Sequence, residues 1–378
     1  MSNVTFLVSG AAGFIGSNFV FMLAKERPDA RIVVLDKLTY AGNIMTISSL
    51  VDSGKVIFVH GDIADKKLVG ELLEKYTPAY VVNFAAESHV DRSVNDPTPF
   101  ITANIDGTFN LLECCRRQRD EQLKTDTTPT LLKFVQVSTD EVYGDLEIGA
   151  PVEIPEAVAA KLGRTGIMYG SDSFTESTPL RPSSPYSASK ASSDMLVMSY
   201  FRSFGMPVTI TRCSNNYGPR QFPEKLIPLM INNILEGREL PVYGEGLNVR
   251  DWIHVDDHCY GVLASAEKGR TGQVYNFGGY SERKNIDIVR LLLKYMKELA
   301  GTKHGEELIR YVKDRPGHDM RYAIDAEKSM DELGWRPRHT FEDGLRSTVA
   351  WYLENKDWCD KIISGEYRQY YKMMYSDR

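Results

Sequence analysis

A tyrosine and a lysine four residues apart, Tyr186 and Lys190, are side chains that could transfer a proton. On a helix, residues with this spacing share one face, so the ammonium of Lys190 would lie beside the phenol of Tyr186. A neighbouring positive charge favours phenolate and lowers a phenol pKa that is about 10 when unperturbed. We therefore expect Tyr186 to act as a base toward a hydroxyl such as that of a sugar.

Two adjacent carboxylates, Asp140 and Glu141, follow Thr139 at the end of the apolar run 134–138. In open α/β sheets, active-site residues collect at the carboxyl ends of the strands. Burial and mutual repulsion raise one pKa of such a pair, so that one carboxyl stays protonated while the other ionises. The sequence leaves open which of the two carboxyls is protonated. For an isolated Asp-Glu pair, the alternative is an acidic turn exposed to solvent. Together with Tyr186 and Lys190, the pair predicts oxidation coupled to elimination.

A glycine-rich turn, Gly10-x-x-Gly13-x-x-Gly16, follows the first apolar run and opens a stretch with helical spacing. Such glycines let the main chain approach a pyrophosphate at a helix N-terminus. Asp36 ends the next apolar run, where an acid can accept a hydrogen bond from a ribose 2′-hydroxyl and would repel a 2′-phosphate. The sequence therefore favours NAD over NADP, although Lys37 would weaken that repulsion.

The elements that must position these residues alternate along the first half of the chain. Continuous β-branched runs suit strands that are covered on both faces, and strands alternating with helices imply a parallel sheet. The runs are 5–8, 31–36, 56–59, 80–84, 134–138 and 208–211. We predict an α/β fold: a Rossmann-type doubly wound parallel sheet with a smaller, discontinuous α/β substrate-binding lobe.

The pattern changes after about residue 212, which suggests two domains. We expect residues 1–212 plus about 249–279 to form the NAD-binding domain, and about 213–248 plus 280–378 to form the nucleotide-sugar-binding domain. The segment 145–184 is long, carries several Pro and Gly, and is expected to be an excursion near the mouth of the site. Its role cannot be read from its residues.

The composition narrows the class of protein. The chain has 378 residues, 42% hydrophobic and 25% charged, with a formal net charge of −6, which argues against a nucleic-acid or acidic-membrane partner. Its 5 cysteines form no C-x-x-C pair, so we expect a reduced, cytoplasmic protein and no bound metal. We also expect no signal peptide and no membrane span, because no apolar run approaches about 20 residues.

Taken together, these motifs resemble the extended short-chain dehydrogenase/reductases. Within that family, Thr139-Asp140-Glu141 and the segment 85–93 closely resemble the dTDP-glucose 4,6-dehydratases, and the resemblance extends from Gly10 to about Trp358. Sugar-nucleotide epimerases are similar in the Tyr and Lys but have no Asp-Glu pair there. GDP-mannose dehydratases are similar as well, but usually have Ser before the Glu.

The resemblance implies a role for each catalytic residue. Tyr186, assisted by Lys190, would take the proton of the sugar C4 hydroxyl, which Thr139 holds, while hydride passes to NAD. Glu141 would then remove the C5 proton, and Asp140 would protonate the departing C6 hydroxyl. Hydride returns to C6, giving a 4-keto-6-deoxy sugar nucleotide.

The resemblance also implies the binding residues. Those expected to contact NAD are Gly10, Gly13, Phe14, Ile15, Gly16, Asp36, Lys37, Leu38, Thr39, Asp62, Ile63, Phe84, Ala85, Ala86, Ser88, Tyr186, Lys190 and Asn216. Those expected to contact the nucleotide sugar are Ser88, Thr139, Asn215, Lys225, Leu226, Ile227, Pro228, Leu229, Met230, Pro241, Val242, Tyr243, Arg250, Asn285, Asp314, Arg315, Pro316, Gly317 and His318. Arg250, Arg315 and His318 would face the diphosphate, and Tyr243 would stack on the base.

Helices near 104–117 and 186–204 would pair across a two-fold axis into a homodimer, again by resemblance. Three alternatives stay open at this point: a dehydratase acting on a UDP- or GDP-hexose, a sugar-nucleotide 4-epimerase, and a non-catalytic NAD-binding scaffold. Thymine itself is inferred from the family likeness, since uracil differs from it by one methyl group.

Overall fold

The computed structural model describes residues 4–314 and 318–362. Its centre is a seven-stranded sheet with the order β12-β8-β5-β4-β1-β2-β3, in which each neighbouring pair is parallel. The strands are β1 (Thr5–Ser9), β2 (Arg31–Asp36), β3 (Val56–His60), β4 (Tyr80–Asn83), β5 (Lys133–Thr139), β8 (Val208–Cys213) and β12 (Gln273–Phe277). The strand order reverses at β1, and in such sheets the crevice beside the reversal is where ligands bind.

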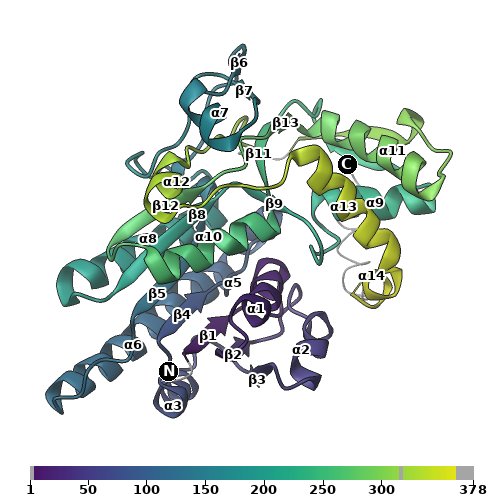
Figure 1. Cartoon of the computed structure of the whole chain (residues 1–378). Helices are drawn as coiled ribbons and strands as arrows, with labels where there is room; N and C mark the ends of the chain where they lie inside the picture. The colour runs from purple at the N-terminus through teal and green to yellow at the C-terminus, as the bar shows by residue number, and fades with distance from the viewer. Residues whose placement is uncertain (1–3, 315–317, 363–378) are drawn as a thin grey trace.

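Helices cover both faces of this sheet (Figure 1). One face is covered by α1 (Phe14–Glu26) and α10 (Val255–Lys268), and the other by α3 (Lys66–Tyr76), α6 (Gly107–Lys124) and α8 (Pro185–Phe204). Buried Val, Leu, Ile and Phe side chains of strands and helices form one core on each face. Burial of each such side chain stabilises the fold by about 1.5–3 kcal/mol. The predicted doubly wound α/β fold is confirmed, because the central strands are parallel and helices pack on both faces of the sheet.

A second, smaller lobe surrounds its own apolar core. Strand β11 (Val249–His254) pairs in parallel with β9 (Asn215–Tyr217) and antiparallel with β13 (Glu282–Lys284), and β10 (Leu240–Tyr243) pairs with β14 (Ile309–Val312). The helices of this lobe are α9 (Leu226–Glu236), α11 (Asn285–Ala300), α13 (Phe341–Glu354) and α14 (Lys356–Ile362). The chain enters and leaves the lobe more than once, so the lobe is discontinuous; the domain boundaries given above stay a prediction.

The segment 145–184 extends beyond the sheet, at the top of Figure 1. It contains the antiparallel pair β6 (Pro151–Glu153) and β7 (Ile167–Tyr169), with α7 (Glu156–Leu162) between them. Side chains of this segment share a core with β12 and with α12 (Glu327–Leu333). The remaining elements are η1 (Ile44–Thr46), α2 (Ser48–Asp52), α4 (Val90–Asn95), α5 (Thr98–Phe100), η2 (Ile101–Asp106), η3 (Asp140–Tyr143) and η4 (Glu306–Leu308).

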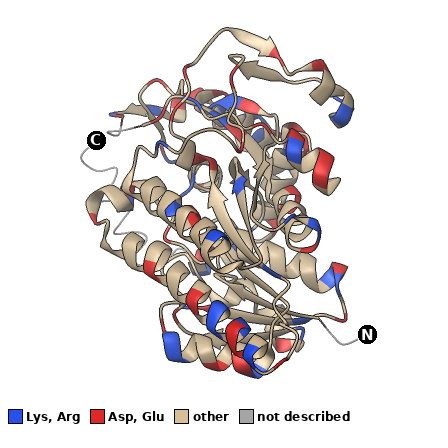
Figure 2. Ribbon diagram, turned by 90° about the vertical axis from the view of Figure 1, so that its left-hand side faces the viewer, with Lys and Arg blue, Asp and Glu red and all other residues tan. Residues whose placement is uncertain are grey.

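Charged residues of both signs are interspersed along the helices in the view of Figure 2, with no continuous basic stripe. Within residues 4–314 and 318–362, every helix is too short or too polar to cross a bilayer.

Candidate active site

One cleft lies along the carboxyl ends of the central strands and collects most of the predicted cofactor residues. Its lining is Gly10, Gly13, Phe14, Ile15, Gly16, Leu35, Asp36, Lys37, Thr39, Tyr40, Ala41, Gly42, Gly61, Asp62, Ile63, Phe84, Ala85, Ala86, Glu87, Ser88, Ala103, Val137, Ser138, Tyr186, Lys190, Gln221, Phe222, Glu224 and Lys225. Of the predicted cofactor set, Leu38 and Asn216 lie outside this lining. The side chain of Asn216 instead bonds to His258 Nδ1 at 3.0 Å.

The glycine turn shapes one wall of the cleft. Gly10 has a φ of +72°, and a Cβ there would lie 2.5 Å from the main-chain nitrogen of Ala85. A Cβ at Gly16 would lie 2.4 Å from the carbonyl oxygen of Gly10. Larger residues at these two positions would push the turn, β4 and α1 apart. The glycines therefore allow the N-terminus of α1, with its unpaired amides, to face the cleft.

Asp36 is buried at the end of β2 and is fixed by two main-chain amides. Its Oδ2 accepts from Ala12 N and its Oδ1 from Leu38 N, both at 2.8 Å. Burial raises the pKa of the carboxyl, and the two amide bonds oppose that shift. Lys37 pairs with Asp62 at 2.6 Å, so its ammonium is directed away from Asp36. This arrangement fits a dinucleotide with a free ribose diol and disfavours a 2′-phosphate.

The helix carrying Tyr186 and Lys190 begins where the sequence predicts. Ser184 caps α8, and its side chain exchanges hydrogen bonds with Ser187 in a capping box, which typically contributes about 1 kcal/mol. Both functional side chains are buried in the first turns, and Lys190 Nζ donates to the carbonyl oxygen of Val137 at 2.7 Å. Burial lowers the pKa of Lys190 to about 8.

The pKa of Tyr186 is raised well above that of a free phenol, so the predicted lowering is wrong for this structure. Burial is the main cause, and the negative charge of Glu141 adds to it. A hydrogen bond with Thr139 acts in the opposite direction but does not outweigh them. The spacing of Tyr186 and Lys190 indicates the nearby lysine, but not the desolvation of the phenol or the approach of carboxylates, which depend on the packing of the fold.

The two carboxylates lie directly after β5, in the short helix η3. Thr139 Oγ1 donates to Asp140 Oδ1 at 3.3 Å and accepts from Glu141 N at 3.3 Å. Asp140 is 2% exposed, and its Oδ2 has no hydrogen-bond partner among the described residues. Burial, together with the negative charges of Glu141 and Asp251, raises the pKa of Asp140 well above its usual value. The protonated form of Asp140 is therefore favoured, as a general acid requires.

Asn104 is a structural residue of the site that the sequence did not reveal. It lies in the π-helical turn η2, a feature often found at functional sites. Its amide exchanges two bonds with the main chain of Glu87, at 2.9 and 3.0 Å, and donates to Ser189 Oγ at 2.8 Å. It thereby joins the loop after β4 to α8. A mid-helix asparagine carries no motif that would have identified this role.

The lining also includes residues that were not predicted to bind a ligand, among them Tyr40, Glu87, Gln221, Phe222 and Glu224. The ring of Phe222 meets the ring of Tyr40 edge-on at 5.7 Å, and Glu224 lies 3.5 Å from Arg92. These contacts join a loop of the second lobe to the cofactor side. They depend on long-range packing, which no local pattern encodes.

The predicted substrate residues lie on several elements of the second lobe and its borders. Lys225 Nζ donates to the carbonyl oxygen of Ser88 at 3.2 Å, at the cleft, whereas Ile227 and Met230 are buried in the core of the lobe. The Tyr243 hydroxyl donates to Asp91 Oδ2 at 3.3 Å. Asn285 begins α11, Pro241 and Val242 lie in β10, and His318 bonds to Asp314 at 2.6 Å. Arg315, Pro316 and Gly317 lie outside the described residues.

Arg250 is a buried cation in β11, with 5% of its surface exposed. Its guanidinium donates to the carbonyl oxygens of Val249 and Asp319 at 2.7 and 2.8 Å. The same group lies 4.2 Å from the centre of the Tyr322 ring.

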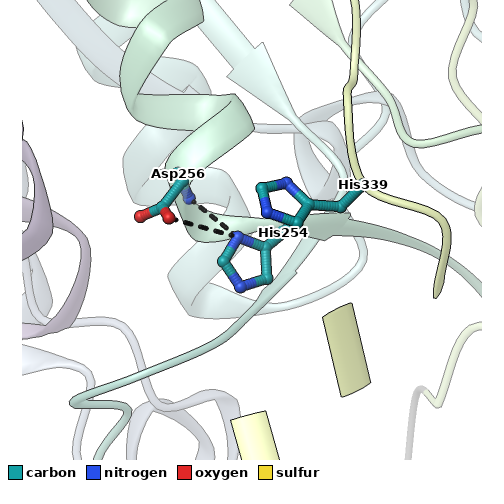
Figure 3. Close-up of side chains that lie close together, drawn as sticks. All are labelled: His254, Asp256 and His339. Carbon is teal, nitrogen blue, oxygen red and sulfur yellow. Dashed lines mark hydrogen bonds and ion pairs between the residues drawn. The ribbon is translucent and has the colours of Figure 1, made fainter. Parts of the chain in front are cut away.

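Two histidines and an aspartate, His254, Asp256 and His339, group together away from this cleft (Figure 3). The imidazole rings stack at 4.0 Å with 27° between their planes, so their in-plane lone pairs do not converge on one point. His339 Nδ1 is held by Asp257 at 3.0 Å. Burial lowers the pKa of His254 to about 4, and the bond to Asp257 raises that of His339.

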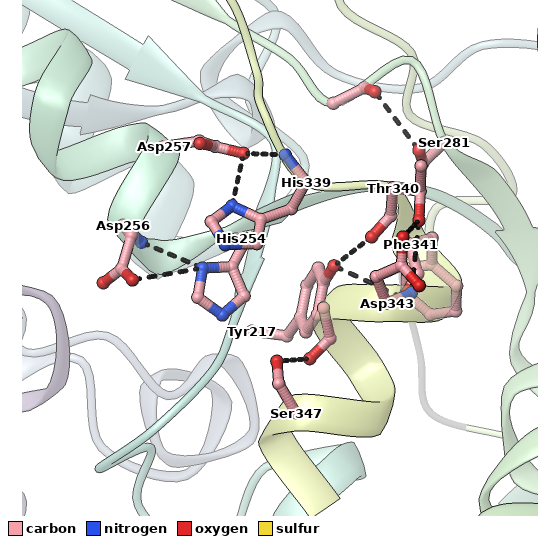
Figure 4. A network of polar contacts seen from close by, with 12 residues as sticks. Tyr217, His254, Asp256, Asp257, Ser281, His339, Thr340, Phe341, Asp343 and Ser347 are labelled. Atoms are coloured by element: carbon pink, nitrogen blue, oxygen red, sulfur yellow. Dashed lines mark hydrogen bonds and ion pairs between the residues drawn. The ribbon is translucent and has the colours of Figure 1, made fainter. Parts of the chain in front are cut away.

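Figure 4 shows that this group belongs to a larger polar network. The Tyr217 hydroxyl donates to the carbonyl oxygens of Thr340 and Phe341, both at 3.5 Å. The network connects the ends of β9 and β11 with the start of α13. We call His254, Asp256, Asp257 and His339 the histidine joint, because they fasten the segment before α13 to the start of α10.

Known proteins resemble this chain over most of its length. Residues 6–278 match the NAD dependent epimerase/dehydratase family. The chain is 49% identical to a dTDP-glucose 4,6-dehydratase of Xanthomonas campestris pv. campestris, over 96% of this chain and 97% of that protein. It is 42% identical to the solved dTDP-glucose 4,6-dehydratase DesIV of Streptomyces venezuelae with NAD and TYD bound, with a TM-score of 0.81 and coverage of 95% and 100%. A solved UDP-glucose 4-epimerase of Thermotoga maritima with UDP-glucose is 27% identical, with a TM-score of 0.76 and coverage of 93% and 100%.

Proposed function

Because this chain belongs to the NAD dependent epimerase/dehydratase family, we propose that it is a dTDP-glucose 4,6-dehydratase, a lyase that converts dTDP-glucose to dTDP-4-keto-6-deoxyglucose and water. The observation that carries this proposal is the buried Asp140, with its raised pKa, beside Thr139 and Glu141 at the end of β5. Elimination of the C6 hydroxyl needs such an acid. Full-length likeness to dTDP-glucose dehydratases supports the thymidine nucleotide.

The cofactor is NAD, held by the glycine turn, Asp36 and the residues at the ends of β3 and β4. When bound, NAD supplies reversible hydride acceptance, taking hydride from C4 and returning it to C6. The two main-chain amides that hold Asp36 leave its remaining lone pairs for the ribose hydroxyls.

The proton transfers fall to the side chains around α8 and η3. Tyr186 takes the C4 hydroxyl proton in its phenolate form while Thr139 holds the hydroxyl. Burial and the charge of Glu141 disfavour that form, and positive charge from Lys190 on the same helix and from the oxidised nicotinamide would favour it. A ketone at C4 acidifies the C5 proton, which Glu141 removes. Asp140 donates its proton to the C6 oxygen, which leaves as water. As C6 accepts hydride, Glu141 returns its proton to C5, and the proton taken by Tyr186 restores Asp140 by way of solvent, so every side chain ends the cycle as it began. The cofactor is regenerated in each turnover, so the net reaction is a dehydration.

An alkaline assay tests this function directly. Incubation with dTDP-glucose followed by alkali should develop the near-ultraviolet absorbance of a 4-keto-6-deoxy sugar. Conversion to dTDP-galactose without that absorbance would identify a 4-epimerase instead, and would overturn the proposal. The same assay with UDP-glucose and GDP-mannose tests the nucleobase, and dTDP-glucose should have the highest kcat/KM.

We also propose a cytoplasmic homodimer. The 5 cysteines are buried free thiols, as expected in a reducing compartment. Exposed apolar side chains on neighbouring helices, including Phe109 of α6 and Met195 of α8, support an interface on this face.

A further inference from the structure

Arg250 is buried and forms no close ion pair within the described residues, although its charge opposes the rise in the pKa of Asp140; its other face suggests a site for a ligand anion. Within the described residues its guanidinium forms no ion pair, and its polar partners are the carbonyl oxygens of Val249, Asp319 and Met320, at 2.7, 2.8 and 3.4 Å. Carbonyl oxygens orient a guanidinium without neutralising its charge. A desolvated cation of this kind attracts a phosphate strongly.

The segment 319–322 fixes this guanidinium from two sides. Asp319 supplies the carbonyl oxygen that accepts from Arg250, and Tyr322 supplies an aromatic face 4.2 Å away. The Tyr322 hydroxyl in turn donates to Asp319 Oδ2, so the two contacts are linked. Tyr322 is buried, and burial together with the charge of Glu141 raises its pKa, so it remains a neutral donor.

The excursion 145–184 holds the same segment at three places. Ser183 Oγ donates to Asp319 Oδ2 at 2.5 Å. Asp145 Oδ1 accepts from the amides of Met320 and Arg321, at 2.7 and 3.0 Å. Arg321 also donates to the carbonyl oxygen of Gly170 at 3.3 Å. Both ends and the middle of the excursion therefore contact the stretch that carries Arg250's partners.

We propose that the excursion 145–184 is a brace that positions Arg250 for the substrate diphosphate, acting through Ser183, Asp319 and Tyr322. This inference rests on the proposed function and adds three positioning residues to it. Because they act through Arg250, their loss should weaken binding of the diphosphate. Contacts to the nucleoside and the chemical steps should be affected much less.

The test is a series of four variants assayed with dTDP-glucose. Tyr322→Leu removes the ring and the hydroxyl, Tyr322→Phe removes only the hydroxyl, and Ser183→Ala and Asp319→Asn break the link to the excursion. Ser171→Ala is the matched control, since Ser171 is exposed in the same excursion and, among the residues that the structure describes, its side chain hydrogen-bonds to the neighbouring Asp172 alone. Thermal unfolding of each variant establishes that it is folded.

We expect Tyr322→Leu to raise KM about tenfold with kcat within about threefold of wild type, since a desolvated cation–π contact is lost. Tyr322→Phe should retain most of the affinity, and Ser183→Ala should raise KM about threefold, as the loss of one hydrogen bond would. In titration calorimetry, the Kd of dTDP should rise in each variant by about the same factor as the KM. Thymidine, which has no phosphate, should bind them as it binds wild type.

The proposal is overturned if KM and the dTDP affinity are unchanged in Tyr322→Leu and Ser183→Ala. It is also overturned if thymidine affinity falls in parallel with dTDP affinity, because that pattern indicates general damage to the lobe. Turnover by wild type tests the proposed function separately. If wild type forms no 4-keto sugar, that function is wrong, whereas the comparison of dTDP with thymidine still decides the brace.

Discussion

At the scale of single residues, Asp140 and Glu141 are adjacent in sequence but differ in surroundings. Asp140 is buried, and one of its oxygens has no hydrogen-bond partner within residues 4–314 and 318–362, while Glu141 is only half-buried. Desolvation therefore acts most strongly on Asp140 and favours its protonated form. The assignment of Asp140 as acid and Glu141 as base agrees with this difference in burial.

Replacing Asp140 by Asn should separate the two halves of the reaction. An amide cannot donate an acidic proton to the C6 oxygen, so water loss should slow by about 10²–10⁴-fold, whereas the first oxidation should slow far less. Single-turnover absorbance at the reduced nicotinamide band should then show NADH accumulating. Asp172→Asn, at an exposed site, is the control. Equal slowing of both steps would refute the acid role.

The Asp36 carboxylate should decide which dinucleotide binds. In wild type, the main-chain amides of Ala12 and Leu38 donate to the two carboxylate oxygens of Asp36. In Asp36→Asn, the side-chain NH₂ group would face one of these N–H donors instead of accepting its hydrogen bond. We expect NAD affinity to fall about tenfold or more, as for other bonds to a charged group, and the preference for NAD over NADP to shrink. Fluorescence titration with both dinucleotides measures this. Asp52→Asn, exposed in α2, should change neither, and an unaltered NAD-to-NADP ratio in Asp36→Asn would contradict the assignment.

The sequence predicted many of the residues that line the cleft, but it did not predict their pKa values. The glycine turn and Asp36 follow apolar runs, and the residues that end parallel strands meet at one edge, so their proximity follows from the pattern. The raised pKa of Tyr186 does not, because desolvation depends on which distant carboxylates and apolar side chains enclose it. The left-handed conformation of Leu38, with a φ of 55°, also has no signal in a non-glycine residue.

At the scale of elements, the strands of the central sheet were predictable because most of them are buried apolar runs, whereas the junctions between elements were not. Helix α9 begins at Leu226, where Lys225 takes the cap position, and Glu224 lines the cofactor cleft just before it. The histidine joint is another junction of this kind. His254 and His339 are far apart in sequence, and only the packing of α13 against β11 brings their rings together.

The histidine joint should make stability depend on pH. The pKa of His339 is raised in the folded state by Asp257, so its contribution is fully present below the unfolded value near 6.5 and is lost as pH rises through the higher folded value. His339→Gln should therefore lower the free energy of unfolding by about 1 kcal/mol at pH 6, and by less at pH 8.5. Urea denaturation at both pH values measures the difference.

His304→Gln provides the control for this prediction, because His304 is exposed. It should leave the free energy of unfolding nearly the same at both pH values. A loss in His339→Gln that is equal at pH 6 and pH 8.5 would show that the imidazole acts by packing rather than by charge.

A buried ion pair of the second lobe also contacts the excursion, since Glu282 Oε2 accepts from the amide of Tyr169 at 2.9 Å and Arg321 donates to the carbonyl oxygen of Gly170. Arg321 donates twice to Glu282, at 2.8 Å each, and both side chains are almost completely buried. Glu282→Gln would leave the Arg321 charge uncompensated and should destabilise the fold by about 3–5 kcal/mol. Chemical denaturation measures this, with Glu306→Gln at an exposed pair as the control. A change below 1 kcal/mol would mean that the pair is hydrated in solution.

At the scale of the whole molecule, the proposed dimer predicts a mass of twice the chain's 42.7 kDa in solution. Met195 and Phe109 are 59% and 47% exposed on helices that pack side by side. A charge at the centre of an apolar interface is costly, so Met195→Glu combined with Phe109→Glu should yield monomers. Sedimentation equilibrium distinguishes the two states. Tyr311→Glu, 54% exposed on β14, should stay dimeric, and a dimeric double variant would place the interface elsewhere.

The position of β12 at the edge of the central sheet has a consequence for biosynthesis. This strand is residues 273–277, yet it pairs with β8, which the ribosome made much earlier. Until β12 leaves the exit tunnel, β8 is an apolar edge strand of the nascent chain, with one side unpaired. Such an edge can form a ladder with a strand of another chain. Messages truncated before codon 273 should therefore give products that aggregate, even though they encode every glycine of the cofactor turn.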